Sequence, residues 1–145
     1  FILDKNIMKI PNFTESLSAV ARIGSDYIGI TKNGAISIYA GFYRKNDIKS
    51  FARCKLLIDK IQNLIGLQFG GEELGNGAYK LNHDENHKTA SISASNFFTL
   101  NELKPLNWYG KYPPEKFDDG VRKNVYMIDL EQKIVTQRKE NKPQN

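Results

Sequence analysis

The dipeptide Asn33-Gly34 constrains this chain most, because it lies between two segments whose apolar residues alternate. Residues 27–32 read Tyr-Ile-Gly-Ile-Thr-Lys, and residues 35–40 read Ala-Ile-Ser-Ile-Tyr-Ala. A period of two is typical of a strand with one buried face, and Asn-Gly readily supplies the two positive φ angles of a tight hairpin turn. We therefore predict a β-hairpin. The side chains expected to face the core are Ile28, Ile30, Ile36 and Ile38.

A second hairpin is predicted over residues 51–69. Residues 51–58 alternate between apolar and polar side chains, residues 59–63 are a polar connector, and residues 64–69 are apolar again. A helix over residues 51–65 is the alternative. The side chains that fit its period of 3.6 are Phe51, Cys54, Leu57, Ile58 and Ile61.

Two further hairpins follow from weaker alternation. Short strands over residues 78–81 and 88–92 would flank a polar connector, residues 82–87, after a glycine-rich stretch. Residues 111–117 and 124–130 flank the turn Asp118-Asp119-Gly120. Pro113 and Pro114 make residues 111–117 an edge strand or an irregular segment, because proline has no N–H to donate.

Helix signals are few and short. Thr14 is a candidate cap of a helix that ends at Gly24, and residues 41–50 form a loop or a single helical turn. Ser93 or Ser95 would cap another helix, which runs through about Leu103 and ends before Pro105. Its predicted packing residues are Phe97, Phe98, Leu100 and Leu103. The predicted fold class is α+β, with antiparallel, hairpin-built sheets and one or two packing helices.

The length of 145 residues suits one domain. We expect a single β-rich domain over residues 1–131 and a polar, mobile tail over residues 132–145. The single cysteine, Cys54, forms no internal disulfide and is predicted to be a buried apolar side chain. No apolar run is long enough for a membrane span, so a soluble protein of the cytoplasm or nucleoid is expected. Because the sequence begins with Phe1, it does not establish where the natural chain starts.

The net charge of +5 is unevenly distributed along the sequence. Residues 1–70 contain ten Lys and Arg against five Asp and Glu, whereas residues 71–145 contain eleven of each. An excess of positive charge in one half of a chain favours a polyanionic partner.

Alternation in the first two hairpins also predicts an outward face. If Cys54 and Leu56 point inward with the four isoleucines, rings and cations point outward together, among them Tyr27, Tyr39 and Arg53. Proteins that bind single strands stack bases on such rings and place cations against phosphates. The alternative is that a helix, a second sheet or an identical subunit covers the rings. The predicted nucleic-acid-binding residues are Tyr27, Lys32, Tyr39, Tyr43, Arg44, Lys45, Arg53 and Lys55.

Other patterns are weaker indications of chemistry. His83 and His87 have the spacing of a His-Glu-x-x-His zinc motif, but Asp84 stands in place of the glutamate, so a solvated turn is favoured. Glu102-Leu103-Lys104 with Asp84 is a short nuclease-like pattern of a kind that arises often by chance. Residues 108–112, Trp-Tyr-Gly-Lys-Tyr, fit a satellite core or a stacking site. We predict no catalytic residue, metal or cofactor.

The order of hairpins followed by a helix, together with a basic and aromatic face over residues 25–130, resembles the positive-cofactor-four and Whirly group of single-stranded DNA-binding proteins. The resemblance implies antiparallel sheets, homo-oligomers assembled through helices, and binding of single strands along a sheet. Residues 33–38, Asn-Gly-Ala-Ile-Ser-Ile, also resemble a stretch of AbrB-type domains, which are dimeric and bind duplex DNA.

The predicted function is non-catalytic binding of nucleic acid, with single-stranded DNA or RNA favoured and a homo-oligomer expected. Two other classes remain open. The same face could serve protein–protein interaction or oligomerisation, and a metal-dependent nuclease is the third and least favoured reading.

Overall fold

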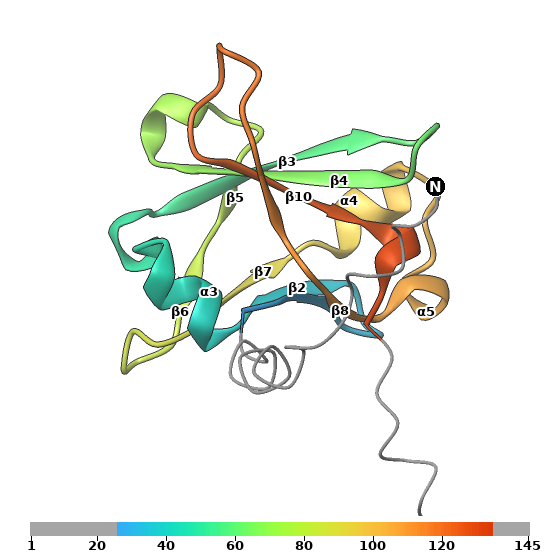
Figure 1. Ribbon diagram of the computed structural model, residues 1–145, viewed down its shortest axis with the longest axis horizontal. Coiled ribbons are helices and arrows are strands. Elements are labelled where there is room, and N and C mark those ends of the chain that lie inside the picture. Colours follow the sequence, from blue (N-terminus) through green and yellow to red (C-terminus); the bar gives the residue numbers. More distant parts are fainter. Residues whose placement is uncertain (1–25, 135–145) are drawn as a thin grey trace, which may run out of the picture.

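Two antiparallel sheets lie face to face in a computed structural model, which describes residues 26–134 (Figure 1). Sheet A contains, in spatial order, β6 (Asn82–His83), β7 (Ala90–Ser93), β2 (Ala35–Ile38), β1 (Ile28–Ile30) and β8 (Gly110–Tyr112). Sheet B contains β5 (Tyr79–Lys80), β3 (Arg53–Asp59), β4 (Leu64–Gly70), β10 (Val125–Asp129) and β9 (Glu115–Phe117). The predicted α+β class with antiparallel sheets built from hairpins is confirmed.

Two bent segments join the sheets at both edges. Only Leu81 separates β5, at the edge of sheet B, from β6, at the edge of sheet A. Likewise only Pro113 and Pro114 separate β8 of sheet A from β9 of sheet B. Leu81 is buried at its corner. Each edge strand therefore continues into the other sheet instead of presenting a long row of unpaired backbone groups.

The core lies between the two sheets. Ile28 pairs with Ile38 and Ile30 with Ile36 across β1 and β2, and all four predicted core isoleucines are buried. Phe69 and Tyr126 of sheet B form an aromatic centre with Phe42, whose ring centroid lies 6.1 and 4.9 Å from theirs. Cys54 is also buried, as predicted, and Leu56 packs against the same cluster.

The first hairpin is present, but its turn differs from the predicted one. The Thr31 N–H donates to the carbonyl oxygen of Ala35, and the Thr31 side-chain oxygen accepts from the Ala35 N–H at 3.0 Å. Gly34 alone in this turn has a positive φ, +89°. The loop is therefore closed partly by a threonine side chain and requires one left-handed residue, not two.

The second hairpin is confirmed as β3 and β4, which pair from Arg53↔Gly70 to Asp59↔Leu64. The helical alternative for residues 51–65 is wrong. In the connecting turn Asn63 supplies a positive φ of 59°, and the Asp59 carboxylate accepts from the Gln62 N–H at 3.1 Å. Pairing of β3 with β4 forms the backbone hydrogen bonds of both segments and turns the alternate side chains of each toward the core. A single helix over residues 51–65 would leave residues 66–69 without this partner.

The third and fourth hairpins are shifted from their predicted positions. Residues 78–81 do not pair with 88–92: β5 pairs with β3, and Asn82–His83, predicted as connector, pairs with β7 instead. Residues 115–117 and 125–129 do pair, but the strand predicted over 111–117 is broken, because β8 pairs with β1. In both places the chain bends from one sheet to the other.

The helices are short and cover the two ends of the sandwich (Figure 1). They are α3 (Ala40–Lys45), α4 (Ser95–Leu100) and α5 (Pro105–Trp108), with 3-10 turns η2 (Ile48–Ser50), η3 (Glu72–Leu74) and η4 (Leu130–Gln132). Phe97 and Phe98 are buried as predicted, but Leu100 is 72% exposed. Neither serine caps α4 through its side chain. Pro105, predicted to end a helix, instead occupies the first position of α5.

The predicted ends of the domain are only partly described. The helix predicted over residues 14–24 and the residues after Ile134 lie outside the described range. Of the predicted tail only residues 132–134 are described, and there the Ile134 N–H donates to the Lys111 carbonyl oxygen at 2.8 Å. Within residues 26–134 no helix is long and apolar enough to span a membrane.

Substitution of Leu67 tests how much the packing of the core contributes to stability. Leu67 is fully buried and lies opposite Leu56 and Tyr126 in the neighbouring strands. Leu67→Ala should lower the free energy of unfolding by about 2–5 kcal/mol, through lost transfer energy and a residual cavity. Urea unfolding followed by circular dichroism measures it. Ile61→Ala in the adjacent turn, where Ile61 is 94% exposed, is the control and should change stability by less than about 0.5 kcal/mol.

Candidate nucleic-acid interface

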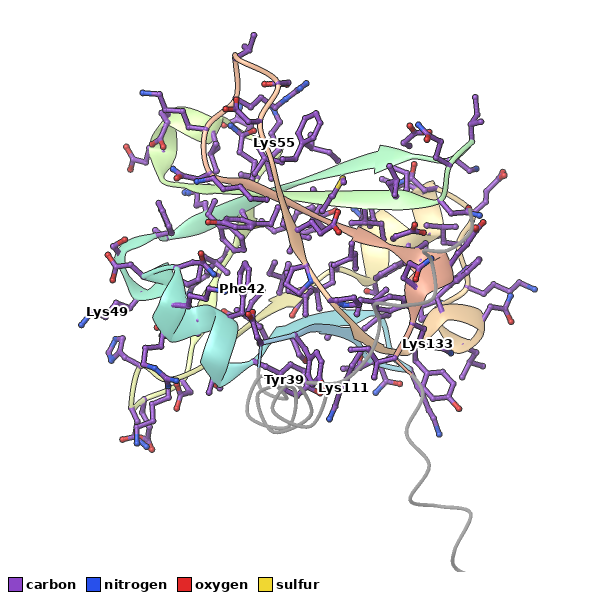
Figure 2. All side chains as sticks on the ribbon, viewed as in Figure 1. Tyr39, Phe42, Lys49, Lys55, Lys111 and Lys133 are labelled. Atoms are coloured by element: carbon purple, nitrogen blue, oxygen red, sulfur yellow. The ribbon has the colours of Figure 1, made fainter. Side chains whose placement is uncertain are left out.

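The predicted binding residues do not form one surface. Tyr27 and Tyr39 lie on the outer side of sheet A, whereas Arg53 and Lys55 belong to β3 in sheet B. Figure 2 shows Tyr39 beneath sheet A and Lys55 at the far side of the molecule. The prediction of a continuous face assumed that β3 extends the first hairpin. The chain instead crosses from sheet A to sheet B through α3, so the two hairpins have opposite outer sides.

Tyr43, a predicted binding residue, lies in the interior, and Phe51 is half-buried against the core. Tyr43 is 2% exposed, and its hydroxyl lies 2.7 Å from His83 Nδ1. His83 Nε2 lies 2.7 Å from the Phe51 carbonyl oxygen, which only accepts, so Nε2 carries the hydrogen and Nδ1 accepts from Tyr43. Burial, and then the charges of Asp84 and Asp47, raise the pKa of Tyr43. The Phe51 ring packs on Phe69.

Tyr27, Tyr39 and Lys111 form a compact group on the outer side of sheet A. The two rings meet edge to face, with centroids 6.0 Å apart and an interplanar angle of 84°. The Lys111 ammonium lies 5.4 Å from the Tyr27 centroid and 5.2 Å from that of Tyr39. Figure 2 shows Tyr39 and Lys111 side by side. The ammonium therefore makes a cation–π contact with both rings at once.

A row of small and polar residues crosses the sheet beside this group. Register pairs Lys111 with Gly29, Gly29 with Ser37, Ser37 with Ser91, and Ser91 with Asn82. A Cβ atom on Gly29 would lie 3.0 Å from a Tyr39 ring carbon, so glycine is what allows this ring to rest on the sheet. A hollow of about 480 Å³ continues the row, with Ser37, Tyr39, Asn82 and Ser91 in its lining.

A second ring extends the surface. Lys32 and Lys133 place their ammonium groups 4.9 and 5.3 Å from the Tyr109 centroid, and Lys133 Nζ donates to the Tyr109 carbonyl oxygen at 3.0 Å. Tyr109 is 41% exposed. We call Tyr27, Tyr39, Tyr109, Lys32, Lys111 and Lys133 the tyrosine–lysine face.

The sequence missed half of this face, although a signal for it was present. Residues 108–112 fit either a satellite core or a stacking site, and in the structure alternate residues do each. Tyr112 is fully buried, its pKa raised to about 12 by that burial, and Trp108 packs against the core. Tyr109 and Lys111, between and beside them, carry the surface cluster.

Arg44 and Lys45 are exposed on α3, and neither contacts the ring of Tyr27, Tyr39 or Tyr109 through a cation–π interaction in the described residues. Lys45 forms an ion pair with Asp26 at 3.2 Å. Arg44 forms no ion pair with any residue from 26 to 134.

The other sequence patterns also have definite positions. Asp84 belongs to the β6–β7 turn, where its carboxylate accepts from the backbone N–H groups of Asn86, Lys88 and Thr89. Glu102 lies near Lys60 of the β3–β4 turn, 3.8 Å from its ammonium. The His83 and His87 rings stack with centroids 6.0 Å apart. Within the described range no three His, Cys, Asp or Glu side chains are grouped to hold a metal.

No protein-family model, curated protein or solved structure matches this chain. The resemblance to the positive-cofactor-four and Whirly group, and that to AbrB-type domains, therefore stay predictions.

Asp84 should make stability depend on pH. The N–H groups of Thr89 and Lys88 hold its pKa below the ordinary value, helped by Asn86 and the charge of His87. A lowered folded pKa stabilises the protein above the unfolded value, about 4, and this stabilisation is lost as pH falls through the folded pKa. Asp84→Asn should be less stable than wild type at pH 7 and lose less stability on acidification. Urea unfolding between pH 7 and pH 2 measures both.

Glu85→Gln is the matched control for Asp84→Asn, since Glu85 is exposed in the same turn. It should follow the wild-type pH profile. A wild-type profile for Asp84→Asn as well would contradict the role assigned to the Asp84 carboxylate.

Proposed function

We propose that the protein binds single-stranded nucleic acid, without catalysing a reaction, along the tyrosine–lysine face of sheet A. The observation that supports this most directly is the Lys111 ammonium in contact with the rings of both Tyr27 and Tyr39. Rings accept stacked bases and the ammonium meets the phosphate that joins them.

The shape of the surface favours a single strand over a duplex. Stacking on Tyr39 requires a base with a free π face, which a base pair within a duplex does not offer. The floor beside the ring contains Gly29, Ser37 and Ser91, whose small side chains let a sugar–phosphate chain approach the sheet. Hydroxyl groups in that floor can hydrogen-bond to phosphate or sugar oxygens without reading sequence.

The cations of the face are available to phosphates. The ion pairs among residues 26–134 are Lys45–Asp26, Lys60–Glu102 and Arg122–Asp119. Lys32, Lys111 and Lys133 belong to none of these. Lys32 and Lys111 contact tyrosine rings, and Lys133 contacts the Tyr109 ring and donates to its carbonyl oxygen. A cation–π contact on an exposed surface contributes only about 0.5–1 kcal/mol. Phosphates can therefore recruit these lysines at small cost.

Variants of the face test the proposal by fluorescence anisotropy with a labelled single-stranded oligonucleotide. Tyr39→Ala should weaken binding by about 1–3 kcal/mol, the usual cost of one stacked base. Lys111→Gln should weaken binding and reduce the slope of log affinity against log salt by about 0.7, the share of one phosphate contact. Lys55→Gln removes the same charge from sheet B and is the matched control, with wild-type affinity expected.

The choice of nucleic acid gives a separate criterion. Single-stranded DNA and RNA should bind more tightly than duplex DNA of the same length. Equal affinity for the duplex, or equal losses from Lys55→Gln and Lys111→Gln, would contradict a stacking site on sheet A and indicate nonspecific attraction to a basic protein.

A second candidate function is homo-oligomerisation through the outer side of sheet B. Leu57, Leu64 and Met127 are half-buried there around Gly66, and Phe117 is 40% exposed beside them. The patch forms a hollow of about 310 Å³ whose lining includes a single charged residue, Asp59. An apolar surface without a dominant charge fits another copy of itself, since it requires no complementary charge.

Analytical ultracentrifugation tests this candidate. Wild type should show a concentration-dependent oligomer that Leu57→Lys or Phe117→Lys converts to a monomer, while Tyr39→Ala leaves the oligomer intact. A monomer at every concentration would exclude it, and loss of the oligomer through Tyr39→Ala would assign the interface to sheet A instead.

A further inference from the structure

A pocket of about 370 Å³ opens where α3 faces the β6–β7 turn. It is distinct from the tyrosine–lysine face but begins at the next residue, since Tyr39 belongs to the face and Ala40 lines the pocket. Its polar lining comes from three segments of the chain. These residues are Tyr43 and Arg44 of α3, Asp47 and Lys49 of the following turn, and His87 and Lys88 of the β6–β7 turn.

Positive charge dominates this pocket. Arg44, Lys49 and Lys88 carry three charges against the single carboxylate of Asp47, and none of the three cations forms an ion pair within residues 26–134. Asp84, in the same turn as His87 and Lys88, adds a second carboxylate whose charge acts on Tyr43. Three cations against two carboxylates leave a net positive charge at the pocket, and an anion would neutralise it.

The backbone holds two lining residues in fixed positions. Asp47 has φ 52° and His87 has φ 53°, both in the left-handed region that non-glycine residues seldom adopt. The Asp47 carbonyl oxygen accepts the Ser50 N–H, and the His87 ring stacks on His83, itself hydrogen-bonded to Tyr43. The wall of the pocket is thus continuous with buried structure, although the cationic ends are exposed.

We propose that this pocket binds a terminal phosphate monoester of the strand that lies on the tyrosine–lysine face. The inference rests on the proposed function. A terminal phosphate carries a charge of nearly −2 near neutral pH, against −1 for each phosphodiester within a strand, so three cations favour the strand end. A concave pocket also accepts the end of a chain, whereas a continuing backbone would have to enter and leave by the same opening.

The route from the face to the pocket is short. The hollow beside Tyr39 is lined by Asp84 and Thr89, and the pocket by His87 and Lys88, so the same β6–β7 turn forms a wall of each. A strand stacked on Tyr39 and running along Ser37 and Ser91 therefore reaches the edge of sheet A at this turn. The volume of the pocket leaves room for the terminal sugar as well as its phosphate.

Single-stranded oligonucleotides that differ only at their ends test the inference. One single-stranded sequence is prepared with a 5′-phosphate, with a 3′-phosphate and with hydroxyls at both ends, and the dissociation constants are measured by competition against a labelled strand. One phosphorylated form should bind about tenfold more tightly than the hydroxyl form, the effect of one well-formed charge-assisted contact. Arg44→Gln with Lys49→Gln should abolish that ratio, while binding of the hydroxyl form changes little.

Arg53→Gln with Lys55→Gln is the matched control, because it removes two charges on sheet B and should preserve the ratio. Equal affinity of wild type for all three strands would overturn the assignment of the pocket to a terminal phosphate and leave the proposed function standing. A ratio that survives in the Arg44 and Lys49 variant would also overturn it. Failure of every strand to bind would overturn both.

Discussion

The two bent segments at the sheet edges determine most of what this molecule presents to solvent. At one edge the chain passes from β5 to β6 through Leu81, and at the other from β8 to β9 through Pro113 and Pro114. Each bend lets one short segment pair with two neighbours in different sheets, so both sheets close upon a shared core. Pairing of β8 with β1 sets Lys111 opposite Gly29 and so places it beside the first hairpin.

Gly29 shows how one small residue converts a sheet surface into a site. Its neighbours in β1, Ile28 and Ile30, are core residues, so the strand would be stable with a larger outward side chain between them. Any such side chain would meet the Tyr39 ring at 3.0 Å and lift it from the sheet. Ser37, paired with Gly29, also has a small side chain, so the outer side of the sheet stays shallow at the next strand. The rings are therefore presented above a shallow floor, a shape that suits a flexible polymer better than a compact ligand.

The alternation of apolar residues predicted those parts of the fold in which a strand pairs with its neighbour in the sequence. Alternation placed the isoleucines of β1 and β2 and the interior residues Cys54 and Leu56 correctly, because pairing of adjacent strands preserves the period of two. It failed where the partner of a strand is distant in sequence. Nothing near residues 78–83 indicates that β5 pairs with β3 while β6 pairs with β7. The prediction of the candidate site was affected most. Arg53 and Lys55 were assigned to the same face as Tyr27 and Tyr39, but the crossover through α3 places them in the other sheet.

The distribution of charge in space differs from that along the sequence for the same reason. The first seventy residues hold the whole net charge, yet two of the three lysines on the tyrosine–lysine face, Lys111 and Lys133, come from the neutral half. Their own half balances them with acids such as Asp118 and Asp119, which lie in the exposed β9–β10 turn. Folding thus gathers cations from both halves at sheet A and leaves many of the acids elsewhere. A polyanion that recognises this face must recognise the folded chain, because only the pairing of β8 with β1 brings Lys111 to Tyr27.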